Sequence, residues 1–371
     1  MTVERDIAGF ALPFASGVFA SVYAGSALHG SCSIYAAVAL TAATVLSLII
    51  LHPVVRHADS RMVRSLIAAA ALSAGMFCGF NTEIIFISSI TETSASYARK
   101  ACAAMQAAID RIPFSDTSCN ALAKALITGE RSEIPSEMTQ AFRESGASHI
   151  LALSGLHLGI IFMAMTRLLS IAGNGRKRSI SRSVIILTAC GFYTIATGAG
   201  PSIVRAFIFI LIHETARLTH RHASTGHTLL TALIIQLALD PSSALSAGFQ
   251  LSYAAMAGIA FILPWLKSFW PGEINKDKTA ERNVRKLWNS LAMSISCQIT
   301  TGPIAYIYFG TLPKYFLLTN LIAIPLTGII IPSVIFILIL NSLGICPPIA
   351  IRTTELLMTF LFNSMEIIST M

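Results

Sequence analysis

Long apolar runs separated by short polar stretches follow one another along most of the chain. Runs of about 20 apolar residues have the length that a helix needs to cross a bilayer, and these runs lack the alternation of a membrane β-strand. The runs that we interpret as membrane helices are residues 7–28, 33–51, 65–88, 149–169, 183–198, 202–219, 225–240, 244–265, 288–309, 315–340 and 350–369. The pattern predicts an all-α polytopic membrane protein, a bundle of about 10–12 transmembrane helices.

Prolines complicate one of these runs. Pro325 and Pro332 lie inside 315–340, so this stretch is either one kinked span or two short broken spans. The start of the chain, MTVERD, is a weak basic region with no clear small-residue cleavage site after it, so we do not expect the first run to be a cleavable signal.

Composition and charge agree with a membrane protein. The 371 residues are 54% hydrophobic and only 12% charged, whereas a soluble domain carries about a quarter charged residues. The net charge of +8 comes largely from basic residues in every second loop, which places the N-terminus in the cytoplasm. These loop residues are Arg56, Arg61, Arg64, Arg176, Lys177, Arg178, Arg182, Arg217, Arg221, Lys267, Lys276, Lys278, Arg282, Arg285 and Lys286. The surplus charge is therefore an orientation signal rather than a nucleic-acid patch.

This topology divides the chain into three parts: an N-terminal membrane segment (1–90), an external segment (91–147) and a membrane core (148–371). In the external segment, ARKACAAMQAAIDRI and SEMTQAFRESG predict amphipathic helices on the outer membrane face, the second ending at Gly146. Cys102 and Cys119 both fall on this oxidising side, where a disulfide between them is possible. We find no CxxC pair or zinc spacing and expect no metal or cofactor.

The stretch HILALSGLHLGI (149–160) places polar groups within an apolar run. As one helix, it would carry Ser148, Ala152, Gly155 and Gly159 on one face, a small-residue seam that admits a neighbouring helix. His149, Ser154 and His157 would lie on another arc, with Ser154 and His157 close enough to hydrogen-bond. Three interpretations remain open: a packed helix crossing, a polar path through the bundle, and a metal or nucleophilic site. The absence of a nearby carboxylate to orient a histidine counts against the third.

The stretch TGAGPSIVRAFIFILIHE (197–214) predicts a helix break followed by a new helix. Gly198 and Gly200 interrupt the chain, and Pro201 suits the first turn of the next helix. Arg205 then lies one turn inside an apolar run, where an arginine usually faces protein or water. Because it is about 6 Å from the helix end, it could also reach the membrane surface.

Two later runs carry uncharged polar stripes that suggest facing surfaces inside the bundle. The stripes consist of Ser243, Ser246, Gln250 and Tyr253, and of Ser290, Ser294, Gln298, Thr301 and Tyr308. Hydrogen bonds between helices explain such a stripe, at about 0.6 kcal/mol per contact. Two of them together also fit a hydrated passage.

Four blocks in order resemble the ComEC-type competence protein family, the inner-membrane DNA-uptake channels. They are ALITGERSEIPSEMTQAFRESGASHILALSGLHLGI (125–160), TGAGPSIVRAFIF (197–209), DPSSALSAGFQLSYAAMAGI (240–259) and QITTGPIAYIYFGTLPKYFLLTNLIAIPL (298–326), the last including Asn320. The resemblance implies passage of single-stranded DNA across the bacterial cytoplasmic membrane during natural transformation. It makes His149, Ser154, His157, Arg205, Gln250, Tyr253, Gln298, Thr301, Tyr308 and Asn320 candidates for lining or gating the channel, with Gly155, Gly159, Gly200 and Pro201 packing its helices.

Family members typically also carry an external OB-like domain and often a metallo-β-lactamase-like domain. We expect this chain to be the membrane core alone, without catalysis of its own, since no His-x-His-x-Asp-His motif or phosphate-binding Gly-x-x-x-x-Gly-Lys loop is present. A cytoplasmic ATPase and an external DNA receptor would then be other chains, and a homo-oligomer is possible. The alternatives are a small-molecule or lipid transporter on the same bundle and an intramembrane hydrolase using Ser154 and His157.

Overall fold

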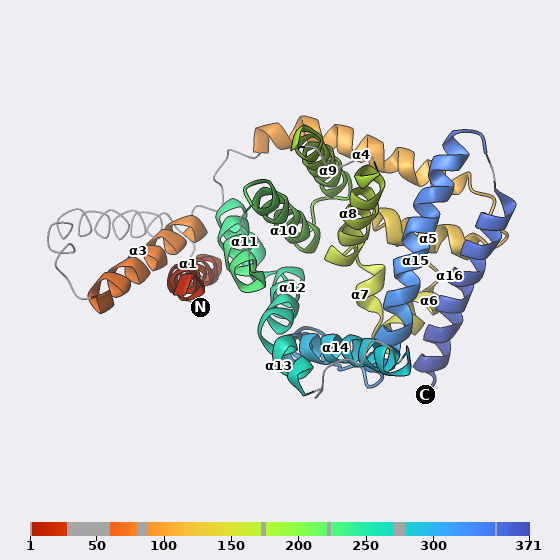
Figure 1. Cartoon of the computed structure of the whole chain (residues 1–371). Helices are drawn as coiled ribbons and strands as arrows, with labels where there is room; N and C mark the ends of the chain where they lie inside the picture. Colours follow the sequence, from red (N-terminus) through yellow and green to blue (C-terminus); the bar gives the residue numbers. More distant parts are fainter. Residues whose placement is uncertain are drawn as a thin grey trace.

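The fold is a set of helices, seen in a computed structural model that describes residues 2–27, 60–80, 88–171, 176–220, 224–269, 279–345 and 347–371 (Figure 1). No β-strand occurs among the residues so described. The predicted span 33–51 lies outside them. The all-α prediction is therefore confirmed for the described part of the chain.

The helices follow the apolar runs of the sequence closely. They are α1 (Thr2–Ala27), α3 (Ser60–Phe80), α4 (Ser88–Asp110), α5 (Thr117–Thr128), α6 (Ser136–Glu144), α7 (Ser148–Leu151), α8 (Gly155–Ser170), α9 (Arg176–Ala196), α10 (Pro201–Leu218), α11 (Thr225–Leu239), α12 (Ala247–Ala257), α13 (Leu263–Ser268), α14 (Thr279–Phe309), α15 (Phe316–Ser342) and α16 (Pro348–Ser369). A 3₁₀ turn, η1 (Pro241–Leu245), precedes α12, and a π-helical turn, η2 (Gly258–Ile262), joins α12 to α13.

Three of the described helical stretches are long and apolar enough to cross a membrane: Arg178–Ala196, Ala247–Ser268 and Phe316–Ser342. The third stretch is α15, one uninterrupted helix through Pro325 and Pro332, so the two-span alternative for this run is wrong. Shorter apolar helices lie at Ile7–Tyr23, Ile67–Gly79, Gly155–Ser170 and Thr225–Leu239.

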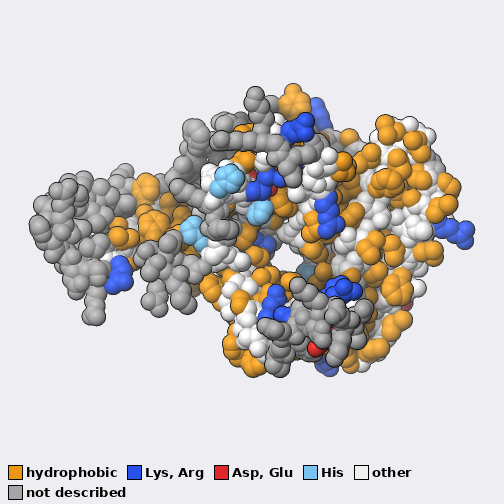
Figure 2. All heavy atoms as spheres, in the orientation of Figure 1, with side chains coloured by type: hydrophobic (Ala, Val, Ile, Leu, Met, Phe, Trp, Pro, Cys, Tyr) orange, Lys and Arg blue, Asp and Glu red, His pale blue; other side chains and the backbone are white. Residues whose placement is uncertain are grey.

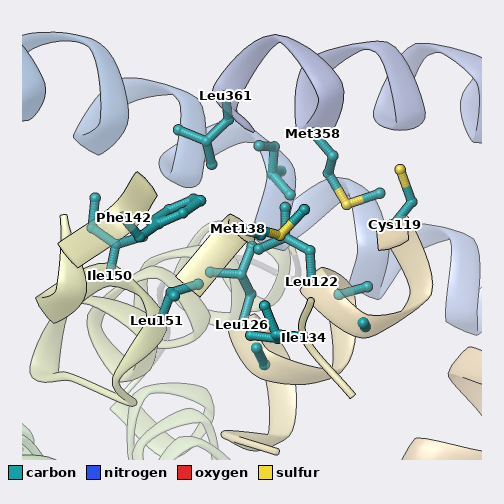
Figure 3. Close-up of a cluster of buried hydrophobic side chains, with 14 of the residues drawn as sticks. Cys119, Leu122, Leu126, Ile134, Met138, Phe142, Ile150, Leu151, Met358 and Leu361 are labelled. Carbon is teal, nitrogen blue, oxygen red and sulfur yellow. The ribbon is translucent and has the colours of Figure 1, made fainter. Parts of the chain in front are cut away.

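The largest hydrophobic cluster joins the segment predicted to be external to the C-terminal helices. Side chains of α5, α6 and α7 pack there against α15 and α16 (Figure 3). Residues Cys119–Thr128 of α5, a helix between the two predicted amphipathic stretches, are buried apart from Asn120. The prediction of an amphipathic helix suits α6, which buries Met138, Ala141 and Phe142 and ends before Gly146 in the left-handed conformation, with φ 83°.

The cysteines of this region are separate thiols. Cys119 is buried in the same cluster, whereas Cys102 on α4 lies 3.7 Å from the Nε2 of Gln106. The disulfide suggested by the sequence is therefore not formed in this structure, where Cys119 packs within the hydrophobic cluster as a free thiol.

The N-terminal helices form a close pair beside α11. A Cβ on Gly17 would collide with the backbone oxygen of Leu72, and one on Gly75 would collide with that of Phe14. Glycines at these two positions let the backbones of α1 and α3 approach closely. In Figure 1 this pair projects from the other helices, and α1 packs on α11.

The remaining helices surround the centre of the molecule. In Figure 1, α8, α10, α12, α14 and α15 are arranged around a central space. The space-filling view of the same face is hollowed at this place, with Lys and Arg side chains near the rim (Figure 2). Most of the predicted site residues lie on these five helices.

Candidate functional site

The predicted helix 149–169 is interrupted at the edge of this centre. Between α7 and α8 the backbone is extended, with φ −80° and ψ 132° at Ala152 and φ −123° and ψ 170° at Ser154. The small-residue seam predicted for one continuous helix is therefore wrong, since Ser148 and Ala152 do not continue the surface of α8. The break places the beginning of a new helix within an apolar run.

Ser154 caps that new helix together with His157. The Oγ of Ser154 accepts a hydrogen bond from the backbone N–H of Leu156 at 3.3 Å, and the N–H of Ser154 donates to Nδ1 of His157 at 3.1 Å. The Oγ also lies 3.0 Å from the same ring nitrogen, so the predicted Ser154–His157 contact is confirmed. Its role is a reciprocal cap, which satisfies N–H groups that the first turn leaves open.

The cap determines the tautomer of His157. Because Nδ1 accepts the N–H of Ser154, the neutral ring carries its proton on Nε2. The side chain is fully buried, and Nε2 has no hydrogen-bond partner among the described residues. His149 lies on α7 and is exposed, with Nδ1 3.1 Å from the carbonyl oxygen of Gly146. The two histidines therefore belong to different helices.

The glycines of α8 differ in their surroundings. A Cβ on Gly155 would lie 3.2 Å from the Cβ of Ala206 and 3.1 Å from a terminal nitrogen (NH2) of Arg205, both on α10. A Cβ on Gly159 would meet nothing within 4 Å. The predicted close approach is confirmed at Gly155 and wrong at Gly159, although α10 also contacts α8 further along, at Phe162.

The start of α10 agrees with the sequence prediction. Gly198 and Ala199 take positive φ values of 86° and 50°, and Gly200 is the N-cap residue. Pro201 occupies the first turn, where a missing N–H costs nothing. A Cβ on Gly200 would meet no atom within 4 Å, so its role is to begin the helix rather than to admit a neighbour.

Arg205 faces the protein interior. Arg205 is only 8% exposed, which excludes the alternative in which its side chain reaches the surface. The guanidinium carbon lies 5.9 Å from the centre of the Tyr253 ring, a cation–π arrangement. The other terminal nitrogen, NH1, is buried without a hydrogen-bond partner among the described residues.

Tyr253 connects this arginine to a third helix. Its hydroxyl donates to the Oε1 of Gln236 at 2.9 Å, and the Nε2 of Gln236 donates to the carbonyl oxygen of Pro201 at 3.0 Å. The three helices α10, α11 and α12 are thus joined by buried polar groups. Gln236 was not among the predicted site residues, although a single amide within the apolar run 225–240 was a usable signal.

The two predicted polar stripes have different outcomes. Ser243 lies in η1 and Ser246 is the N-cap residue of α12, so only Gln250 and Tyr253 lie on the helix itself. Gln250 donates its Nε2 to the carbonyl oxygen of Ala244 at 3.0 Å. The first stripe is therefore largely a set of capping groups, and the prediction of a continuous helix face is wrong for it.

The second stripe lies on one helix, α14. A Cβ on Gly258 of η2 would meet Ser296 and Thr300 of α14, and the Sγ of Cys297 lies 3.9 Å from the carbonyl oxygen of Ala255 on α12. Helical geometry places Thr301 on the same side of α14 as Cys297, and Gln298 on about the opposite side from Ser296. Gln298 and Thr301 are partly buried, and Thr301 donates to the carbonyl oxygen of Cys297 at 2.9 Å.

The last two candidates lie near the ends of helices. Tyr308 is exposed and donates its hydroxyl to the carbonyl oxygen of Leu245 at 3.1 Å, which joins the end of α14 to η1. Asn320 lies in the first half of α15, where its Oδ1 is buried without a hydrogen-bond partner among the described residues. Neither residue contacts Arg205 or His157 in the hydrogen bonds and ring contacts that we find.

A buried ionic group at the opposite end of α10 was missed by the sequence analysis. Glu214 is 1% exposed and accepts hydrogen bonds from Arg217 at 2.7 Å and from the hydroxyl of Ser183 on α9. Arg217 also donates to Ser179 at 3.0 Å. Part of the positive charge that we counted as an orientation signal is thus neutralised within the protein.

The first turn of α8 and the side chain of Arg205 form the central feature of the site. Two buried donors, NH1 of Arg205 on α10 and the protonated Nε2 of His157 on α8, lack partners among the described residues. No group of three or more metal-binding side chains is found in the part of the chain that the structure describes. The arrangement is chemically suited to contact an anion.

Comparison with known proteins places this site within a family. Residues 126–371 match the family model described as Competence protein. The chain is 29% identical over 133 residues to ComE operon protein 3 of Bacillus subtilis (strain 168), which covers 36% of this chain and 17% of that protein. It is 28% identical over 210 residues to competence protein ComA of Neisseria gonorrhoeae, covering 55% of this chain and 28% of that protein.

A further relative covers more of the chain. The uncharacterized protein YcaI of Escherichia coli (strain K12) is 24% identical over 261 residues, which are 69% of this chain and 33% of that protein. The chain thus covers a third or less of the length of these three relatives. No solved structure matches it significantly. The family model includes α7, α8, α10, α12, α14 and α15, and with this match the chain belongs to the competence protein family.

Proposed function

We propose that this chain is the membrane core of a competence-type DNA translocator, which passes single-stranded DNA across the bacterial cytoplasmic membrane. The main support is the family match, which includes the five helices around the central hollow. The relatives named competence protein ComA and ComE operon protein 3 agree with a role in DNA uptake for transformation. The apolar helices agree with a multi-pass membrane protein.

The side chains near the centre suit a sliding polyanion. A single strand moves most readily along weak polar and aromatic contacts, and deep binding sites would hold it in place. Gln298 and Thr301 are partly buried polar side chains of α14, one of the helices around the hollow. Arg205 is a buried cation of this region, and the face of the Tyr253 ring partly compensates its charge.

We propose no catalysis by the chain itself. The contact between Ser154 and His157 has the geometry of a helix cap, with the hydroxyl accepting the N–H of Leu156. Among the described residues, no carboxylate hydrogen-bonds to the other ring nitrogen of His157 to orient it as a base. Energy for transport and recognition of external DNA would then come from other chains, a cytoplasmic ATPase and a DNA receptor.

An anion transporter is the second candidate, and one observation favours it. The break at 152–154 directs the N-terminus of α8 toward Arg205, and transporters use such half-helix ends to bind anionic substrates. This candidate predicts saturable uptake of a small organic or inorganic anion that continues in cells offered no DNA.

Deletion of the gene in its host tests the proposal. Cells receive labelled double-stranded DNA, and nuclease-protected single strand in the cytosol is measured separately from DNA bound outside. We expect deletion to abolish the protected strand and leave outer binding unchanged, and re-expression to restore entry. Equal entry with and without the gene contradicts the DNA function and favours the transporter.

A further inference from the structure

The buried guanidinium of Arg205 lacks a counter-ion in the described structure. The ion pairs found there involve Lys124, His213 and Arg217, and none involves Arg205. A buried charge is costly to a protein unless an opposite charge or a full set of hydrogen bonds compensates it. The ring of Tyr253 provides only partial compensation, and NH1 has no acceptor at all among the residues described.

The N-terminus of α8, next to Arg205, adds to the uncompensated positive charge. The NH2 group of Arg205 lies 3.1 Å from the position that a Cβ of Gly155 would take, and Gly155 is the first residue of the 16-residue helix α8. A helix N-terminus carries about half a positive charge. Two positive groups are thus adjacent in the interior.

An anion between Arg205 and the start of α8 compensates both the guanidinium and the positive end of the helix. Helix N-termini attract phosphate groups through their N–H groups and their dipole, and here the dipole contributes most because Ser154 already accepts the N–H of Leu156. A guanidinium adds a planar pair of donors that matches two phosphate oxygens. Glycine at the first position of α8 leaves the backbone accessible, since a side chain there would occupy the space beside the guanidinium.

We propose that Arg205 and the first turn of α8 form a binding site for a phosphodiester group. This inference rests on the proposed function, which identifies the phosphodiester as part of the transported strand. The same chemistry also occurs in a lipid headgroup, and the experiment below separates the two sources. The site would hold one phosphate at a time and release it as the strand advances.

Binding of a single strand to the full-length protein tests the site. The protein is reconstituted in phosphatidylcholine nanodiscs, and the anisotropy of a labelled 15-nucleotide oligothymidine is measured over a series of salt concentrations. We expect Arg205→Gln to weaken binding at least about tenfold, which corresponds to about 1.4 kcal/mol. Loss of one phosphate contact also reduces the slope of log affinity against log salt by about 0.7.

Two pairs of variants separate local from general effects. Arg352→Gln removes an equal charge from the exposed face of α16 and should leave affinity and slope unchanged. Gly155→Ala inserts a methyl group beside the guanidinium without changing charge and should weaken binding, whereas Gly159→Ala, with open space around it, should not. If Arg205→Gln fails to fold, the strand affinities of Arg205→Lys and Gly155→Ala test the site instead. Both variants disturb the paired donors and retain the charge, so both should bind the strand more weakly than the wild type.

Competition identifies the source of the phosphate. An oligonucleotide with a neutral methylphosphonate backbone should bind the wild type and Arg205→Gln equally weakly. The site would belong to lipid, and the proposal would be overturned, if short-chain phosphatidylglycerol competes for it while the wild type and Arg205→Gln bind the oligonucleotide with equal affinity. Equal affinity of Arg205→Gln and the wild type for the strand would overturn it as well.

The outcome is distinguishable from failure of the proposed function. If the purified protein binds strands through Arg205 while deletion leaves DNA entry unchanged, the phosphodiester site stands and the translocator function fails. If entry depends on the gene while Arg205→Gln binds and imports DNA as the wild type does, the function stands and the site fails.

Discussion

At the scale of single residues, Lys124 is a buried ammonium that two half-exposed carboxylates neutralise. Its Nζ lies 2.7 Å from Asp110 and 2.6 Å from Glu133. Burial acts to lower the pKa of Lys124, but the hydrogen bonds to Asp110 and Glu133 outweigh it and the pKa is raised. Either carboxylate alone still provides the opposite charge, so the two are expected to substitute for one another.

A double-mutant cycle measures this substitution. We expect Asp110→Asn and Glu133→Gln each to lower the free energy of unfolding by less than about 1 kcal/mol. The double variant leaves a buried charge unpaired and should lose about 3 kcal/mol more than the two together. Denaturation of the purified protein in detergent gives the values, with Glu137→Gln on the exposed side of α6 as the control. Additive losses would show that Lys124 does not need a counter-ion.

Residue spacing predicted local contacts well and long-range contacts poorly. The Ser154–His157 bond, Pro201 in the first turn and Gly146 after α6 all depend on neighbours within a few positions, which the sequence displays directly. Whether a glycine touches another helix depends on where that helix crosses. For that reason Gly155 and Gly159 were indistinguishable in the sequence and differ in the structure.

At the scale of helices, the π-helical turn η2 marks the closest contact between α12 and α14. A Cβ on Gly258 would collide with the backbone oxygen of Ser296 and lie 2.7 Å from the Oγ1 of Thr300. We expect Gly258→Ala to cost about 1–3 kcal/mol by overpacking, or to abolish accumulation of the protein. Gly248→Ala on α12 is the matched control, since a Cβ there meets nothing within 4 Å. Equal stability of both variants in thermal denaturation would refute the close crossing.

The positions of most apolar helices were predictable, because a long apolar run in a membrane protein has few alternatives to a helix. The positions at which helices are interrupted were not predictable. Pro325 and Pro332 suggested a break, yet α15 continues through them, since a long apolar helix packed among others tolerates the missing N–H groups. The actual break at 152–154 contains no proline, and its signal was the pairing of a serine with a histidine three residues later, read as a side-chain contact rather than as a helix cap.

At the scale of the whole molecule, part of the segment 91–147, which was predicted to be external, packs against the C-terminal helices. Its helices α5 and α6 share the largest hydrophobic cluster with α15 and α16. The sequence could not show this, because the partners of α5 lie about 200 residues further along the chain. The side of the membrane on which this cluster lies follows only from the charge of the loops.

Labelling of single cysteines determines that side. Ser136→Cys at the start of α6 and Lys286→Cys near the start of α14 both place a thiol at an exposed position, in a background whose native cysteines are replaced by serine. With the N-terminus in the cytoplasm, a membrane-impermeant maleimide should modify the thiol at position 136 in intact cells, and the thiol at 286 only after permeabilisation. The reverse pattern would invert the topology. The outcome therefore decides on which side of the membrane the segment 91–147 lies, which the charge of the loops alone predicts.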